Sequence, residues 1–198
     1  AADLTPYIGN DLVFSSGAAV QTGSYKSRLV VRNLDTGRSA VGGAEGFVGK
    51  LAPAGLSVFT PLLLSQEGRL PLIDGFVKGK LDRLSWHDVY PYDSAGYAPL
   101  SREEVRTGRI AALVPFASSG PDEPLVTFSV RLVNAATVES LPVPAELRRA
   151  FRTPNGRAQL LELALEQVPS GDYIVYFYAA DGASGAVANA HIPLTIRR

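Results

Sequence analysis

The chain of 198 residues contains no cysteine, no methionine, only two histidines and a single tryptophan. The absence of cysteine excludes disulfides, thiol catalysis and Cys-ligated zinc or iron–sulfur sites. No stretch approaches the roughly 18 uninterrupted apolar residues that a membrane-crossing helix requires. We therefore expect no transmembrane segment.

The missing methionine also concerns residue 1. Because translation begins with methionine, the sequence is expected to be a processed product or a fragment of a longer one. The start Ala1-Ala2-Asp3 fits the mature end left by a signal peptidase, which prefers small residues. This predicts an exported protein (periplasmic, cell-surface or extracellular), and a boundary set within a longer chain is the alternative.

Charge is balanced, with 19 Lys plus Arg against 19 Asp plus Glu. Nucleic-acid partners require a concentrated basic face, so we expect no nucleic-acid binding. Hydrophobic residues make up 46% of the chain, which is enough to build a core.

One local pattern occurs twice. Gly23-Ser24-Tyr25 and Gly171-Asp172-Tyr173 each open an alternating strand that ends at a Gly-containing turn and is followed by a return strand. Period-two alternation bounded by such turns is typical of hairpins in antiparallel sandwiches. The sequence therefore predicts an all-β fold of one or two Ig-like or fibronectin-like antiparallel β-sandwich modules with a long connecting loop.

Composition divides the chain into a partial or atypical module (1–70), a connecting segment (71–106) and an Ig-like module (107–198). The apolar stretch 56–64 falls in the first module, and Pro61 predicts an edge or a kink there. Pro144 at a first turn predicts a short helix over 144–149. Strands are expected at 25–32, 39–48, 109–116, 125–133, 157–168, 173–180 and 186–196.

Segments 23–41 and 168–196 share the order Gly-x-Tyr, alternating strand, Asp or Asn, Gly, and the apolar segment 56–64 accompanies them. In this they resemble the C-terminal regions of von Willebrand factor A-related proteins of Acidobacteria-like bacteria. The Asp-x-Ser-x-Ser metal site of the A domain is not present, so no metal-binding residues carry over. The resemblance implies an exported, non-catalytic protein built of extracytoplasmic β modules.

Catalytic motifs are absent: the sequence has no Gly-x-Ser-x-Gly elbow, Walker loop, His-Glu-x-x-His or EF-hand pattern. His87, between Trp86 and Asp88, suits either a metal or acid–base site or a loop histidine bonded to a neighbour. His191 alternates with Ile192 and is expected on a strand surface. We therefore predict no enzyme activity and no cofactor.

Aromatic residues concentrate in one loop, where they alternate with Asp and Pro. Such a loop suits stacking on a sugar ring or burying a partner's side chain, and the alternative is that the rings pin the connection to the sandwich. The residues are Trp86, Tyr90, Tyr92 and Tyr97.

The two repeats differ on the strand face that points away from the core. The first carries Lys26, Arg28, Val30 and Arg32, and the second carries Ile174, Tyr176, Tyr178 and Ala180. Burial of each larger apolar side chain is worth about 1.5–3 kcal/mol, so we expect the second face to be covered by the chain itself or by another protein.

These observations predict a non-catalytic extracytoplasmic β-sandwich protein that acts through protein–protein contacts, as a subunit of a larger assembly or a piece of a surface protein. The alternative is a carbohydrate-binding module that uses the aromatic loop. Open edges of the short first module further predict strand donation between chains or self-assembly. The expected partner-binding residues are Ile174, Tyr176, Tyr178, Trp86, Tyr90, Tyr92 and Tyr97.

Overall fold

The structure is a computed structural model that describes residues 13–15, 21–48, 55–65, 72–74, 97–100, 104–106, 108–119, 125–153 and 156–198. Every regular element within these ranges is a β-strand, which confirms the all-β prediction. Most of the strand pairs are antiparallel. Two short ones are parallel: β1 (Val13–Ser15) with β6 (Leu72–Asp74), and β15 (Val187–Ile196) with β8 (Glu104–Val105).

The chain divides into two compact units. One is Gly17–Leu51, and the other combines Ala1–Ser16 with Ala52–Arg198. The boundaries expected at residues 70 and 106 differ from this division, because β4 (Leu56–Val58) and β5 (Leu62–Ser65) both pair with β9 (Arg109–Ser118). The apolar stretch 56–64 therefore belongs to the sheet of the larger unit.

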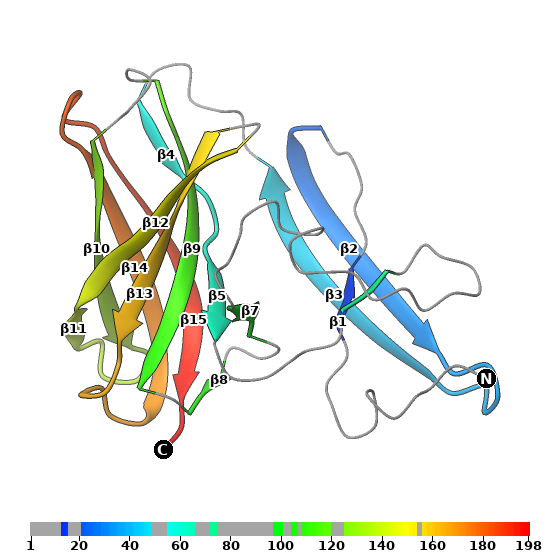
Figure 1. The fold of residues 1–198 in the computed structure, drawn as a ribbon. Coiled ribbons are helices and arrows are strands. Elements are labelled where there is room, and N and C mark those ends of the chain that lie inside the picture. The colour runs from blue at the N-terminus through cyan, green and yellow to red at the C-terminus, as the bar shows by residue number, and fades with distance from the viewer. Residues whose placement is uncertain are drawn as a thin grey trace. The chain divides into compact units, whose positions relative to one another are not determined.

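Two sheets face each other in the larger unit (Figure 1). The first sheet has the order β12-β13-β9-β5-β7, with β4 also paired to β9, and the second has the order β11-β10-β14-β15-β8. The remaining bounds are Ala98–Pro99 for β7, Val126–Asn134 for β10, Ser140–Val143 for β11, Ala145–Thr153 for β12, Gly156–Ala164 for β13 and Gly171–Asp181 for β14.

The core lies between these two sheets. Val175 and Phe177 of β14 are at most 1% exposed and belong to one buried cluster with Val114 of β9 and Leu161 and Leu163 of β13. Alternating residues of each strand contribute to it, as period-two patterning requires. Strands β9, β10, β13, β14 and β15 are close to the expected ranges.

Pro61 marks a break in the apolar stretch 56–64. The chain leaves β4 after Val58 and begins β5 at Leu62, so the kink is found. An edge position is not found for β5, because it pairs with β9 on one side and β7 on the other.

The short helix expected over 144–149 is wrong. Residues Ala145–Thr153 form β12, which pairs with β13 and contains an irregularity between Leu147 and Arg149. The helix prediction rested on local composition, whereas pairing with β13 is non-local. At this strand the Arg148 guanidinium binds carboxylates of both strands, Glu146 at 2.9 Å and Glu162 at 2.9 Å.

The described part of the smaller unit is one hairpin. β2 (Gly23–Arg32) and β3 (Ser39–Val48) pair along their whole length, from Gly23↔Val48 to Arg32↔Ser39. Both strands match the expected ranges 25–32 and 39–48. A further likeness links β2 to β14: the Tyr25 hydroxyl donates to the carbonyl of Gln21 at 2.5 Å, and the Tyr173 hydroxyl donates to the carbonyl of Pro169 at 3.0 Å, in each case four residues upstream.

Three hairpins close with the same six-residue turn, at residues 33–38, 134–139 and 181–186. In each, the first side chain (Asn33, Asn134 or Asp181) accepts backbone N–H bonds from within the turn. The fifth residue has a positive φ, which is 67° at Gly37, 62° at Val138 and 73° at Gly185. Glycine adopts this conformation freely, but a β-branched residue such as valine does so only under strain.

Candidate functional site

The outer face of the second sheet carries the aromatic residues that the sequence singles out. Along β14 the odd-numbered residues Tyr173, Val175 and Phe177 are buried, so the even-numbered residues point away from the core. Ile174 and Tyr176 are half-buried, and Tyr178 is 40% exposed. The structure thus brings Ile174, Tyr176 and Tyr178 together on one face, as the alternation predicts.

Neighbouring strands extend this aromatic row. Pairing places Arg131 of β10 on one side of Tyr176 and His191 of β15 on the other. The rings of Tyr176 and Tyr178 stack with centroids 5.9 Å apart, and Tyr176 lies 5.3 Å from the His191 ring. These ring contacts connect Tyr176 to Tyr178 and to His191 on the sheet surface.

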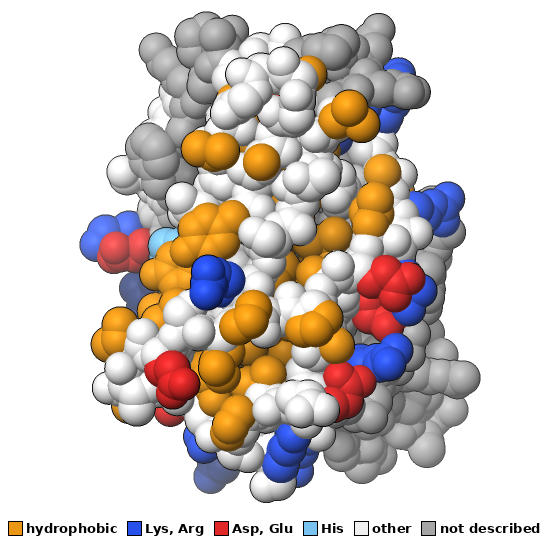
Figure 2. All heavy atoms as spheres, turned by 90° about the vertical axis from the view of Figure 1, so that its left-hand side faces the viewer, with side chains coloured by type: hydrophobic (Ala, Val, Ile, Leu, Met, Phe, Trp, Pro, Cys, Tyr) orange, Lys and Arg blue, Asp and Glu red, His pale blue; other side chains and the backbone are white. Residues whose placement is uncertain are grey.

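Two shallow hollows lie on either side of the centre of β10. One is bordered by Ser129, Tyr178, Val187 and Asn189 with their strand neighbours. The other is bordered by Ser129, Arg131, Pro142 and Val143 with theirs. Figure 2, which faces the side where β10 and β14 lie in Figure 1, shows apolar side chains across the middle of this face and most charged ones around its margin.

The face has few charges. Among its positions on β10, β14 and β15, the only Lys, Arg, Asp or Glu residues are Arg131 and Asp172, and Asp172 lies at the far end, paired with Thr195. Val187 is 77% exposed next to the hollow. A surface with exposed tyrosines and little charge has the composition of the central part of protein interfaces.

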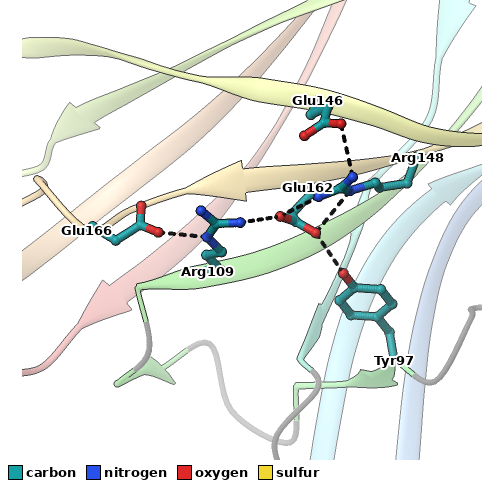
Figure 3. Close-up of polar contacts among 6 residues, drawn as sticks. All are labelled: Tyr97, Arg109, Glu146, Arg148, Glu162 and Glu166. Atoms are coloured by element: carbon teal, nitrogen blue, oxygen red, sulfur yellow. Dashed lines mark hydrogen bonds and ion pairs between the residues drawn. The ribbon is translucent and has the colours of Figure 1, made fainter.

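A cluster of polar side chains lies on the outer face of the first sheet (Figure 3). The Glu162 carboxylate accepts the Tyr97 hydroxyl at 3.0 Å, Arg109 at 3.0 Å and Arg148 at 2.9 Å. Arg109 also binds Glu166 at 2.8 Å. The hydrogen bonds from Arg148 lower the pKa of Glu162, although its partial burial opposes them. A carboxylate held ionised and surrounded by donors suits a structural link between strands, and is unsuited to acting as a general acid.

Tyr97 belongs to this cluster and not to the face of β14. Its side chain is 9% exposed and packs with Leu64, Leu113 and Leu160. This placement favours the alternative in which the ring pins the connection to the sandwich. Trp86, Tyr90, Tyr92 and His87 lie outside the described residues.

Among the residues that the structure describes, no three His, Cys, Asp or Glu side chains gather as a metal site would require. Likewise, no helix among the described residues has the length and hydropathy to span a membrane. Asp35 lies in the turn 33–38 and Asp181 in the equivalent turn 181–186. In the latter, the Asp181 carboxylate accepts the backbone N–H of Ala183.

Sequence reasoning missed the residues that surround the tyrosines. Arg131, His191 and Val187 meet Tyr176 and Tyr178 only through the pairing of β10 and β15 with β14. The alternation along β10 and β15 predicts which side chains point away from the core. No local pattern predicts the strand register that places these side chains next to the tyrosines of β14. The Glu162 cluster was missed for the same reason.

Fold and surface together define an all-β protein with two facing sheets and an aromatic outer face. Comparison with known proteins gives no match: no family model, no curated protein and no solved structure is similar to this chain.

Proposed function

We propose that this is a non-catalytic, exported β-sandwich protein of Ig-like type that acts through protein–protein contacts of the second sheet. The observation that carries the proposal is the row of the half-buried Tyr176 and the exposed Tyr178, bordered by two hollows and nearly free of charge. Export is proposed on the sequence resemblance, and fractionation of the source cells tests it.

The Ig-like assignment is supported by strand order. Taking β5, β9, β13 and β12 as strands A, B, E and D, the first sheet has the order A-B-E-D, and β10, β14 and β15 give C-F-G in the second. The hydroxyl bond from Tyr173 to Pro169 lies at the start of the strand that corresponds to F, where Ig-like domains place their tyrosine corner.

The non-catalytic assignment is supported by the polar groups. Among the described residues, the His191 ring lies tilted against Tyr176 and has no hydrogen bond to a serine or a carboxylate, so it forms no nucleophile–base pair with them. The Glu162 carboxylate already accepts hydrogen bonds from Arg109, Arg148 and Tyr97.

Native mass spectrometry of the chain isolated from its source tests the proposal. We expect a defined complex heavier than 21.0 kDa that is lost in the double variant Tyr176→Ala/Tyr178→Ala. The matched control Arg152→Ala/Arg157→Ala, on the first sheet, is expected to keep the complex. Thermal unfolding of both variants checks that the sandwich remains folded.

A monomer at every concentration would refute the proposal and favour the carbohydrate-binding alternative. The protein has one tryptophan, Trp86, so its fluorescence reports directly on the aromatic loop. A change of this fluorescence with polysaccharides, but not with protein partners, would establish that alternative.

A further inference from the structure

The β2–β3 hairpin has the local features of the β14–β15 hairpin but not its neighbours. Both hairpins start with the same tyrosine-to-carbonyl bond and close with the same turn. In the larger unit, β14 is flanked by β10 as well as β15. Among the described residues, β2 pairs only with β3, so no described strand occupies its second edge.

Side-chain exposure shows the same difference. Val175 and Phe177, which face the first sheet from β14, are at most 1% exposed. Their counterparts on β2 are Ser27 and Leu29. Leu29 is 52% exposed, and Val31, on the same face of the strand, is 40% exposed. A two-stranded hairpin with exposed aliphatic side chains is marginally stable alone and exposes backbone groups that can pair with another strand.

Charge indicates what kind of strand fits. Lys26, Arg28 and Arg32 share the other face of β2, and only Lys26 has a carboxylate partner among the described residues, Glu45 of β3 at 2.6 Å. An incoming strand places its alternate side chains opposite Arg28 and Arg32. Opposite charges across strands are favourable and like charges are unfavourable, so acidic residues suit these positions.

The same charges disfavour a second copy of this chain. Antiparallel pairing of β2 with β2 of another copy centred on Leu29 would set Lys26 against Arg32. We propose that the second edge of β2 is a strand-accepting site for an extended segment of a partner protein that alternates aliphatic and acidic side chains. This segment takes the place beside β2 that β10 takes beside β14, and the proposal does not depend on the Tyr176 and Tyr178 surface.

The test uses the full chain and synthetic peptides of the length of β10, nine residues. One peptide alternates Val and Glu, and the control alternates Val and Lys. At low salt we expect the Glu peptide to bind about tenfold tighter than the Lys peptide, as measured by fluorescence anisotropy. Amide chemical shifts in an NMR titration are expected to move within Gly23–Arg32.

Charge reversal provides the matched variants. Arg28→Glu/Arg32→Glu is expected to reverse the preference, so that the Lys peptide binds tighter, and this gain also shows that the hairpin is folded. The control Arg152→Glu/Arg197→Glu changes net charge equally on exposed residues of the larger unit and is expected to keep the original preference.

The proposal would be overturned by equal binding of both peptides, by binding of the Glu peptide that Arg28→Glu/Arg32→Glu leaves unchanged, or by chemical-shift changes confined to the larger unit. Concentration-dependent self-association with shifts in β2 would also overturn it, because a second copy would then fill the edge.

Discussion

Val138 is the one described residue other than glycine with a positive φ. Its side chain is 75% exposed, so it gains little from packing in return for this strain. The equivalent positions in the other two turns are Gly37 and Gly185. A valine in the left-handed region costs on the order of 1–3 kcal/mol, while glycine adds about 0.5–1 kcal/mol of chain entropy to the unfolded state.

We therefore expect Val138→Gly to raise the free energy of unfolding by about 1 kcal/mol. Urea denaturation followed by circular dichroism measures this value. The reciprocal variant Gly185→Val serves as the control and is expected to lower it. A Val138→Gly protein that is no more stable than the parent would show that the turn is not strained.

Asp181 links its turn to the opposite sheet. The carboxylate accepts the Ala183 N–H at 3.0 Å and the hydroxyls of Ser184 at 2.8 Å and Ser118 at 3.1 Å. These hydrogen bonds, above all that from the Ala183 N–H, lower the pKa of Asp181 below its ordinary value of 3.8. A lowered pKa in the folded state stabilises the protein above that value, and this contribution is lost as the pH falls through the lowered pKa.

Asp181→Asn is expected to remove this pH dependence, because the amide keeps an acceptor for the Ala183 N–H but does not ionise. Asn33 and Asn134 fill the same position in the sister turns. Unfolding free energies measured from about pH 5 to pH 2 should fall less steeply in the variant than in the parent. Parallel curves for the two proteins would contradict the assignment.

At the scale of elements, the repeated tyrosines give a matched pair. Tyr173 is 3% exposed and its hydroxyl bonds the Pro169 carbonyl, so Tyr173→Phe should lower the stability of the larger unit by about 1 kcal/mol. Tyr25→Phe removes the same bond from the smaller unit. We expect it to leave the unfolding midpoint of the larger unit unchanged in calorimetry, and equal effects of the two variants would contradict the division into units.

How far the sequence predicts each element depends on how local its determinants are. Alternation and Gly-containing turns identify β2, β3, β14 and β15 and give the outward direction of Tyr176. They do not predict which strands pair with one another. The pairing of β5 with β9 and the edge position of β12 come from contacts between distant segments. For the same reason 144–149 is misread as helix and the Glu162 cluster is not found.

For the whole molecule, the division into units predicts unequal protection of backbone amides. β2 and β3 have no described strand at their outer edges, whereas β9, β13 and β14 pair on both sides. Hydrogen exchange should therefore be fast across 23–48 and slow across 109–118 and 171–181, because local opening of a lone hairpin requires less free energy. Equal exchange in these segments would show that the hairpin unfolds only together with the sandwich.

The turn that occurs three times also bears on the folding kinetics. Each copy sets its register through bonds within six residues, so its hairpin is able to form in about 1–10 μs, before distant segments meet. Pairing of β5 with β9 and of β10 with β14 closes long loops and is expected to come later. The rate-limiting step then lies in the assembly of preformed hairpins, and substitutions within the turns should alter unfolding rates differently from substitutions between the sheets.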